Sequence, residues 1–168
     1  MTGSGDPCRR SLAGAVVLAV VRTAIAVLDP GIGLFALFDA VSLFIMVVFY
    51  IAVRANIRCF VRDALLARGA DGWSARPITR ARYASVRSII WLFVFILSLI
   101  ILASSALLVP VAMVAVDQAR CMFPVQLLPF ETAVPLAVLH LVLAVPLVAC
   151  LVLLGRALRA ELEAARSA

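Results

Sequence analysis

Residues 54–87 read RANIRCFVRDALLARGADGWSARPITRARYASVR and contain eight of the fifteen arginines in the chain. Long apolar runs lie on both sides of this stretch. Loops that collect basic residues beside membrane spans face the cytosol. The stretch therefore predicts a cytosolic loop between two transmembrane segments, and the topology of the remaining chain follows from it.

The composition is that of a membrane protein rather than a soluble domain. Of the 168 residues, 65% are hydrophobic and 14% are charged, and the mean hydropathy is +1.17. Soluble domains average about 45–50% apolar and about 25% charged residues. We expect one domain over residues 1–168, an all-α, four-helix transmembrane bundle built of antiparallel hairpins. Its spans are the four segments that reach the roughly 17–25 apolar residues a bilayer requires: 11–28, 32–53, 88–116 and 132–154.

The charges of the connecting segments agree on one orientation. Residues 54–87 carry eight arginines against two aspartates, a net charge of +6, whereas the tails 1–10 and 155–168 are each +1. The short connection at Asp29 and the segment 117–131 are each −1. The positive-inside rule then places both termini and residues 54–87 in the cytosol, and the segment 117–131 in the lumen or outside.

The first part of the basic loop has the pattern of a short cytosolic amphipathic helix, which either continues the second span or bends into the membrane interface. Apolar residues recur at helical spacing from 57 to 65, and arginines form a separate row. Residues 69–77 are expected to form turns. The arginines are expected to fix the topology at anionic lipid headgroups, or alternatively to bind a cytosolic partner or phosphoinositides. This basic interface comprises Arg54, Arg58, Arg62, Arg80, Arg82 and Arg87.

Two ionisable residues of opposite charge lie at similar depth in the first two spans. Arg22 is nine residues before Gly31 and Asp39 is eight after it. An unpaired charge in the bilayer costs about 2.5–3.5 kcal/mol, so we expect an Arg22–Asp39 ion pair. Snorkelling of Arg22 to the lumenal face, a contact with a partner's helix and a transport-linked charge are the alternatives. His140 in the fourth span is expected to hydrogen-bond to a neighbouring helix, with candidate partners Ser98, Ser104 and Ser105.

The sequence lacks the patterns that would indicate catalysis. One histidine and four scattered cysteines do not make a metal site. There is no CxxC, no Gly-rich phosphate loop and no GxSxG elbow. We therefore expect no enzymatic activity, no cofactor and no nucleic-acid partner. Cys8 and Cys59 lie beside the membrane on the cytosolic side, where either palmitoylation or an unmodified thiol is expected.

The segment DQARCMFPVQLLPFE (117–131) is apolar for a connection between spans. We expect it either to lie on the membrane surface or to contact another membrane protein. Its contact residues would be Phe123, Gln126, Leu127, Leu128, Pro129 and Phe130. The four-span plan, Arg22 inside the first span and Gln126-Leu127-Leu128-Pro129 before the fourth together resemble the alphaherpesvirus tetraspan envelope proteins.

That resemblance implies a glycoprotein K-like partner and a role in virion egress, glycoprotein trafficking and membrane fusion, in the Golgi, host membranes or the virion envelope. The long acidic N-terminal tail of that family is missing, which puts tail-dependent interactions in doubt, and MARVEL-type tetraspans share the same topology. We expect a non-enzymatic protein that assembles, traffics or organises partner membrane proteins. The alternative is a small oligomeric transporter or channel that uses Arg22, Asp39 and His140.

Overall fold

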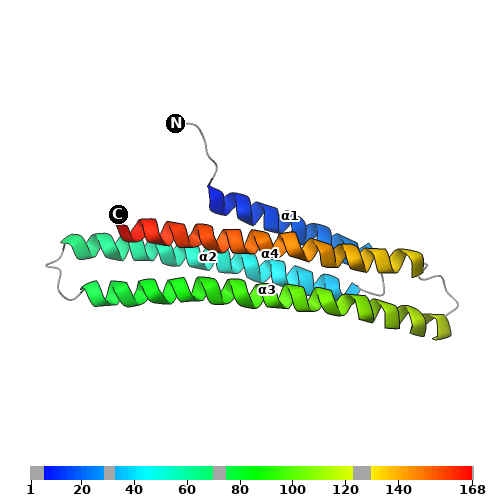
Figure 1. Cartoon of the computed structure of the whole chain (residues 1–168). Coiled ribbons are helices and arrows are strands. Elements are labelled where there is room, and N and C mark those ends of the chain that lie inside the picture. Colours follow the sequence, from blue (N-terminus) through cyan, green and yellow to red (C-terminus); the bar gives the residue numbers. More distant parts are fainter. Residues whose placement is uncertain (1–5, 29–32, 70–74, 123–129, 168) are drawn as a thin grey trace.

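The chain folds into four helices in a computed structural model that describes residues 6–28, 33–69, 75–122 and 130–167. The helices lie side by side and alternate in direction (Figure 1). No strand occurs within the described ranges. The prediction of an all-α, four-helix bundle is confirmed, with helices α1 (Pro7–Leu28), α2 (Gly33–Gly69), α3 (Ala75–Met122) and α4 (Phe130–Ser167).

Each helix contains a segment long and apolar enough to cross a membrane: Pro7–Leu28, Ala36–Asp63, Arg80–Pro110 and Val134–Ala165. Helices α2, α3 and α4 have 37, 48 and 38 residues. At 1.5 Å per residue they are about 55, 72 and 57 Å long, against about 30 Å for the hydrocarbon core. The architecture is therefore that of a multi-pass membrane protein whose longer helices extend beyond the bilayer.

Buried positions on each helix follow a seven-residue spacing. On α2 they include Asp39, Met46, Val53 and Phe60. This period keeps one seam of a helix facing its neighbours, as in coiled coils. A polar residue in that register is buried with the apolar ones, whatever its chemistry. The same spacing on α4 relates Ala137, Ala144, Leu151 and Leu158, and also His140, Leu147 and Leu154.

The bundle has a narrow and a wide diagonal. Helices α1 and α3 each pack against both α2 and α4, and α2 also contacts α4 across the middle. Within the described part of the chain, the backbones of α1 and α3 do not approach each other. The start of α1, the end of α2, the start of α3 and the end of α4 lie at one end of the bundle, which we call the terminal end (Figure 1). The opposite end is called the far end.

An apolar belt covers the outside of the bundle. Large apolar side chains are exposed between residues 17 and 28 on α1, 37 and 51 on α2, 89 and 114 on α3, and 138 and 153 on α4. Exposed apolar surface on all sides of a bundle is unfavourable in water but is the surface that lipid tails solvate. The belt is therefore the membrane-facing surface.

Most helix ends lie outside the predicted span limits; only the end of α1 and the start of α2 do not. Helix α2 continues to Gly69, so the amphipathic stretch after the second span continues that span. Helix α3 begins at Ala75 rather than near 88, so residues 69 and 75–77 of the predicted turn are helical, and residues 70–74 lie outside the described residues. Half of residues 78–87 are Arg or Ala, which are good helix formers, and proline is tolerated in the first turn, where Pro77 lies. The predicted loop 117–131 shortens likewise, because α3 extends to Met122 and α4 begins at Phe130.

Candidate functional site: a buried polar cluster of all four helices

Each helix contributes one polar side chain to a cluster inside the bundle. Arg22 comes from α1, Asp39 from α2, Ser105 from α3 and His140 from α4. Their exposed fractions are 0%, 5%, 0% and 1%. All four occupy seam positions of their helices, which explains why polar groups are buried here. The cluster lies within the candidate spans, toward the far end of the bundle.

Asp39 is the centre of the network. Its Oδ1 lies 3.1 Å from Nη2 of Arg22, and its Oδ2 lies 2.6 Å from Nε2 of His140. A contact of that length with a carboxylate requires a proton on Nε2, so His140 is the donor. Nη2 of Arg22 also donates to Oγ of Ser105 at 2.8 Å, and that hydroxyl donates to the carbonyl of Ile101 at 2.6 Å. The ion pair and the hydrogen bonds together thus connect all four helices at one level.

The guanidinium of Arg22 crosses the wide diagonal of the bundle. Its bond to Ser105 joins α1 to α3, whose backbones do not meet. On the way it passes over His140: Nη2 lies 3.4 Å from both Nδ1 and Nε2 of that ring. Equal distances to the two nitrogens place Nη2 above the ring face rather than along one lone pair. A guanidinium stacks well on a neutral aromatic face.

The charges of Arg22 and Asp39 cancel inside the cluster, because the two side chains carry one charge of each sign. This balance matters because an isolated charge inside a bilayer is costly, whereas a paired and hydrogen-bonded one is tolerated. The ion pair therefore makes the burial of both groups at this depth tolerable.

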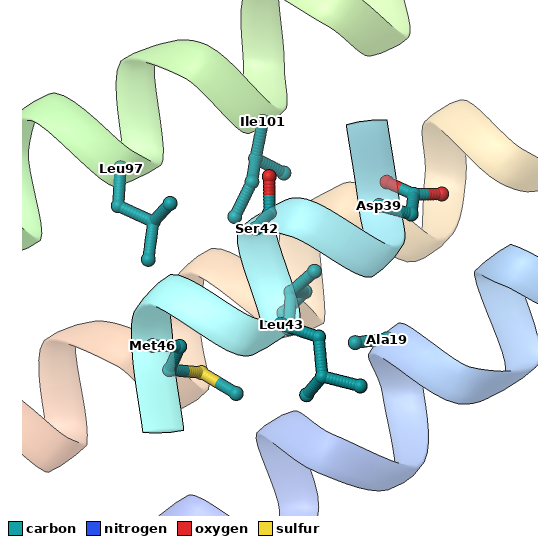
Figure 2. A pocket seen from close by; sticks show the side chains of 8 residues that line it. Ala19, Asp39, Ser42, Leu43, Met46, Leu97 and Ile101 are labelled. Carbon is teal, nitrogen blue, oxygen red and sulfur yellow. The ribbon is translucent and has the colours of Figure 1, made fainter. Parts of the chain in front are cut away.

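A small cavity adjoins Asp39 on its terminal side (Figure 2). Its volume of about 10 Å³ is at the lower limit for one water molecule. Asp39 and Ser42 provide its polar groups. Nε and Nη1 of Arg22 have no hydrogen-bond partner, so the network has spare donors. The apolar lining comprises Ala19, Leu43, Met46, Leu97, Ile101 and Leu147.

The structure brings Arg22 and Asp39 together, as the sequence suggested, and corrects the environment of His140. We expected Ser98, Ser104 or Ser105 as its hydrogen-bond partner, but its imidazole donates to Asp39. The fourth span itself contains no carboxylate, so a search confined to that span does not find Asp39 on α2. The seven-residue register of buried positions, combined with depth in the membrane, could have identified Asp39 as the partner. Asp39 is the seventh residue of α2, Arg22 is the seventh from the end of α1, and His140 is the eleventh of α4.

The basic interface divides into paired and exposed arginines. Arg54 binds Asp6 and, at 2.8 Å, Glu161, and its guanidinium lies 5.4 Å from the ring centroid of Tyr50. It therefore ties the segment before α1 to α2 and α4. Arg82 binds Asp63 and joins α3 to α2. Two of the six predicted members of the basic interface, Arg54 and Arg82, are therefore engaged within the bundle. The exposed members are Arg58, Arg62, Arg80 and Arg87.

The two candidate palmitoylation sites differ in accessibility. Cys8 is 0% exposed and packs with Val53, Ile57 and Leu158, whereas Cys59 is exposed. Burial leaves no room for an acyl chain on Cys8 in this packing, so Cys59 is the better candidate. In the predicted contact segment, Phe123, Gln126, Leu127, Leu128 and Pro129 lie outside the described residues, and Phe130 begins α4.

Comparison of the chain with protein-family models, with curated protein sequences and with solved structures found no match.

Proposed function

We propose that this multi-pass membrane protein acts without catalysis, by assembling, trafficking or organising partner membrane proteins. The observation that carries the proposal is the buried cluster. Its charged groups bind one another inside the bundle and are at most 5% exposed. A cluster that joins four helices at one level restrains their movement relative to one another. Because its charged groups are engaged with one another, the outer surfaces of the bundle are the parts offered to other molecules.

Two outer surfaces are available for such partners. The apolar belt can pack against the transmembrane helices of a partner. Small and polar residues are common at such contacts, but they need not occur on every face of the bundle. The terminal end presents exposed arginines. If the resemblance to the alphaherpesvirus tetraspans holds, the partner would be a glycoprotein K-like membrane protein and the process virion egress or glycoprotein transport.

Crosslinking in native membranes tests this proposal. A tagged chain should purify with a stoichiometric membrane protein, and removal of the chain should prevent that protein from reaching its normal membrane. A tagged, unrelated four-span protein expressed at the same level is the control for non-specific association. The proposal would be contradicted if every protein that crosslinks to the chain still reached its normal membrane in cells that lack the chain.

Flux measurements in proteoliposomes test the competing function, transport through the cluster. We expect no ion or proton flux above that of empty vesicles. Flux that disappears in Asp39→Asn, with the folded fraction of the protein unchanged, would replace the proposed function with transport. Asp39 is the informative position because it binds both Arg22 and His140.

A further inference from the structure

The acidic side chains at the terminal end are all engaged within the described part of the chain. Asp6 and Glu161 bind Arg54, and Asp63 binds Arg82. Glu163 binds Arg159 one helical turn away on α4, at 2.6 Å. These four carboxylates therefore neutralise three arginines, and no other carboxylate among the described residues of this end balances the remaining basic ones.

Seven exposed arginines remain at the terminal end without an ion pair among the described residues. They occur on all four helices, so they are not confined to one helix or one pair of helices. On α3, Arg82 binds α2 while its neighbours Arg80 and Arg87 are exposed. We call these seven the arginine collar: Arg9 and Arg10 on α1, Arg58 and Arg62 on α2, Arg80 and Arg87 on α3, and Arg156 on α4.

The collar lies just beyond the apolar belt on every helix. On α3 the belt begins at Ile89, two residues after Arg87, and on α4 it ends at Leu153, three residues before Arg156. On α2 it ends at Ile51, seven residues before Arg58. At 1.5 Å per residue these nearest members lie about 3–10 Å beyond the belt, whereas Arg80 and Arg62 lie about 14 and 17 Å beyond it. The nearest guanidinium groups therefore lie at the level of the lipid headgroups when the belt lies in the hydrocarbon.

We propose that the arginine collar binds the phosphate groups of anionic phospholipids around the whole circumference of the bundle. A guanidinium is suited to phosphate because its planar fork can donate two parallel hydrogen bonds. A protein partner would contact the arginines on one side of the bundle, whereas lipids contact them on all sides. The distribution over four helices therefore favours lipid. The inference requires only membrane insertion and stands independently of the proposed trafficking function.

Quenching of tryptophan fluorescence by brominated lipids tests the collar in the purified full-length protein. Trp91 lies one helical turn from Arg87, and Trp73→Phe makes it the only tryptophan in the chain. The protein is reconstituted in phosphatidylcholine with either brominated phosphatidylglycerol or brominated phosphatidylcholine. One arginine near a charged membrane surface corresponds to a preference of about five-fold. We expect at least that preference for the anionic lipid, and its decrease at high salt.

The substituted chain carries Gln in place of Arg58, Arg62, Arg80 and Arg87, and its preference should fall close to one. The control replaces Arg159 and Glu163 by Gln, which removes an exposed pair without changing the net charge, and should keep the wild-type preference. If the fourfold variant does not fold, the single substitution Arg87→Gln should still lower the preference for the anionic lipid. No anionic preference in the wild-type protein, or full preference in the folded fourfold variant, would overturn the proposal and favour a protein ligand.

Discussion

Replacement of Asp39 by Asn should destabilise the bundle more than any other isosteric change in its interior. The substitution keeps the size of the side chain but removes the negative charge 3.1 Å from Nη2 of Arg22. The guanidinium is 0% exposed and would remain as an uncompensated positive charge. Removing one partner of a buried pair costs about 3–5 kcal/mol, and insertion scales give about 2.5–3.5 kcal/mol for one central charge. We expect a loss of about 3 kcal/mol in the free energy of unfolding.

The double variant Arg22→Met/Asp39→Asn separates this charge effect from packing. It removes both charges, so it should recover most of the stability lost in Asp39→Asn. Arg22→Met alone should also destabilise the bundle, because Asp39 would then keep its buried charge without the guanidinium of Arg22. The free energy that couples the two substitutions should be at least about 2 kcal/mol, since residues in one network are not additive.

Equilibrium unfolding in mixed detergent micelles, followed by circular dichroism, measures these four proteins. The reasoning would be refuted by an Asp39→Asn protein within about 0.5 kcal/mol of wild type, the range of ordinary surface substitutions. Equal and additive losses in the two single variants would also contradict it, because they would mean that the two charges do not interact. Ser105→Ala is the milder matched control. It removes one bond to Arg22 and leaves both charges, and should cost about 1 kcal/mol.

Three further predictions concern other parts of the molecule. Gly155→Ala should cost about 1–3 kcal/mol in the same unfolding assay, because the added Cβ would lie 2.9 Å from Cγ2 of Val94, and Val94→Ala should restore the loss. In single-cysteine proteins, a water-soluble maleimide should label Cys59 in the folded state but Cys8 only after unfolding, since one is exposed and the other buried; equal labelling would contradict the packing at the terminal end. Glycosylation tags inserted between residues 54 and 87 should remain unmodified, and their glycosylation would reverse the predicted orientation.

Much of the fold was readable from composition and spacing. The apolar segments predict four membrane helices because the length of a span depends only on local sequence. Depth along a hairpin is likewise local, which is why Arg22 and Asp39 could be matched by counting from the turn between them. The helix ends were predicted less well. Polar stretches such as 75–87 can be helical or irregular, and their extension at the terminal end is supported by packing of Phe60 against Tyr83.

The amino-acid sequence by itself determined the lipid-facing belt, the number of helices and the concentration of arginine at one end. Tertiary structure alone decided which charges pair. His140 binds Asp39 because α2 and α4 are in contact across the narrow diagonal of the bundle. Arg54 is not free to bind lipid or a partner, because its guanidinium pairs with Asp6 and Glu161. The physical reason is that the hydrophobicity of a segment is a sum over its own residues, whereas an ion pair depends on which helix faces pack against each other.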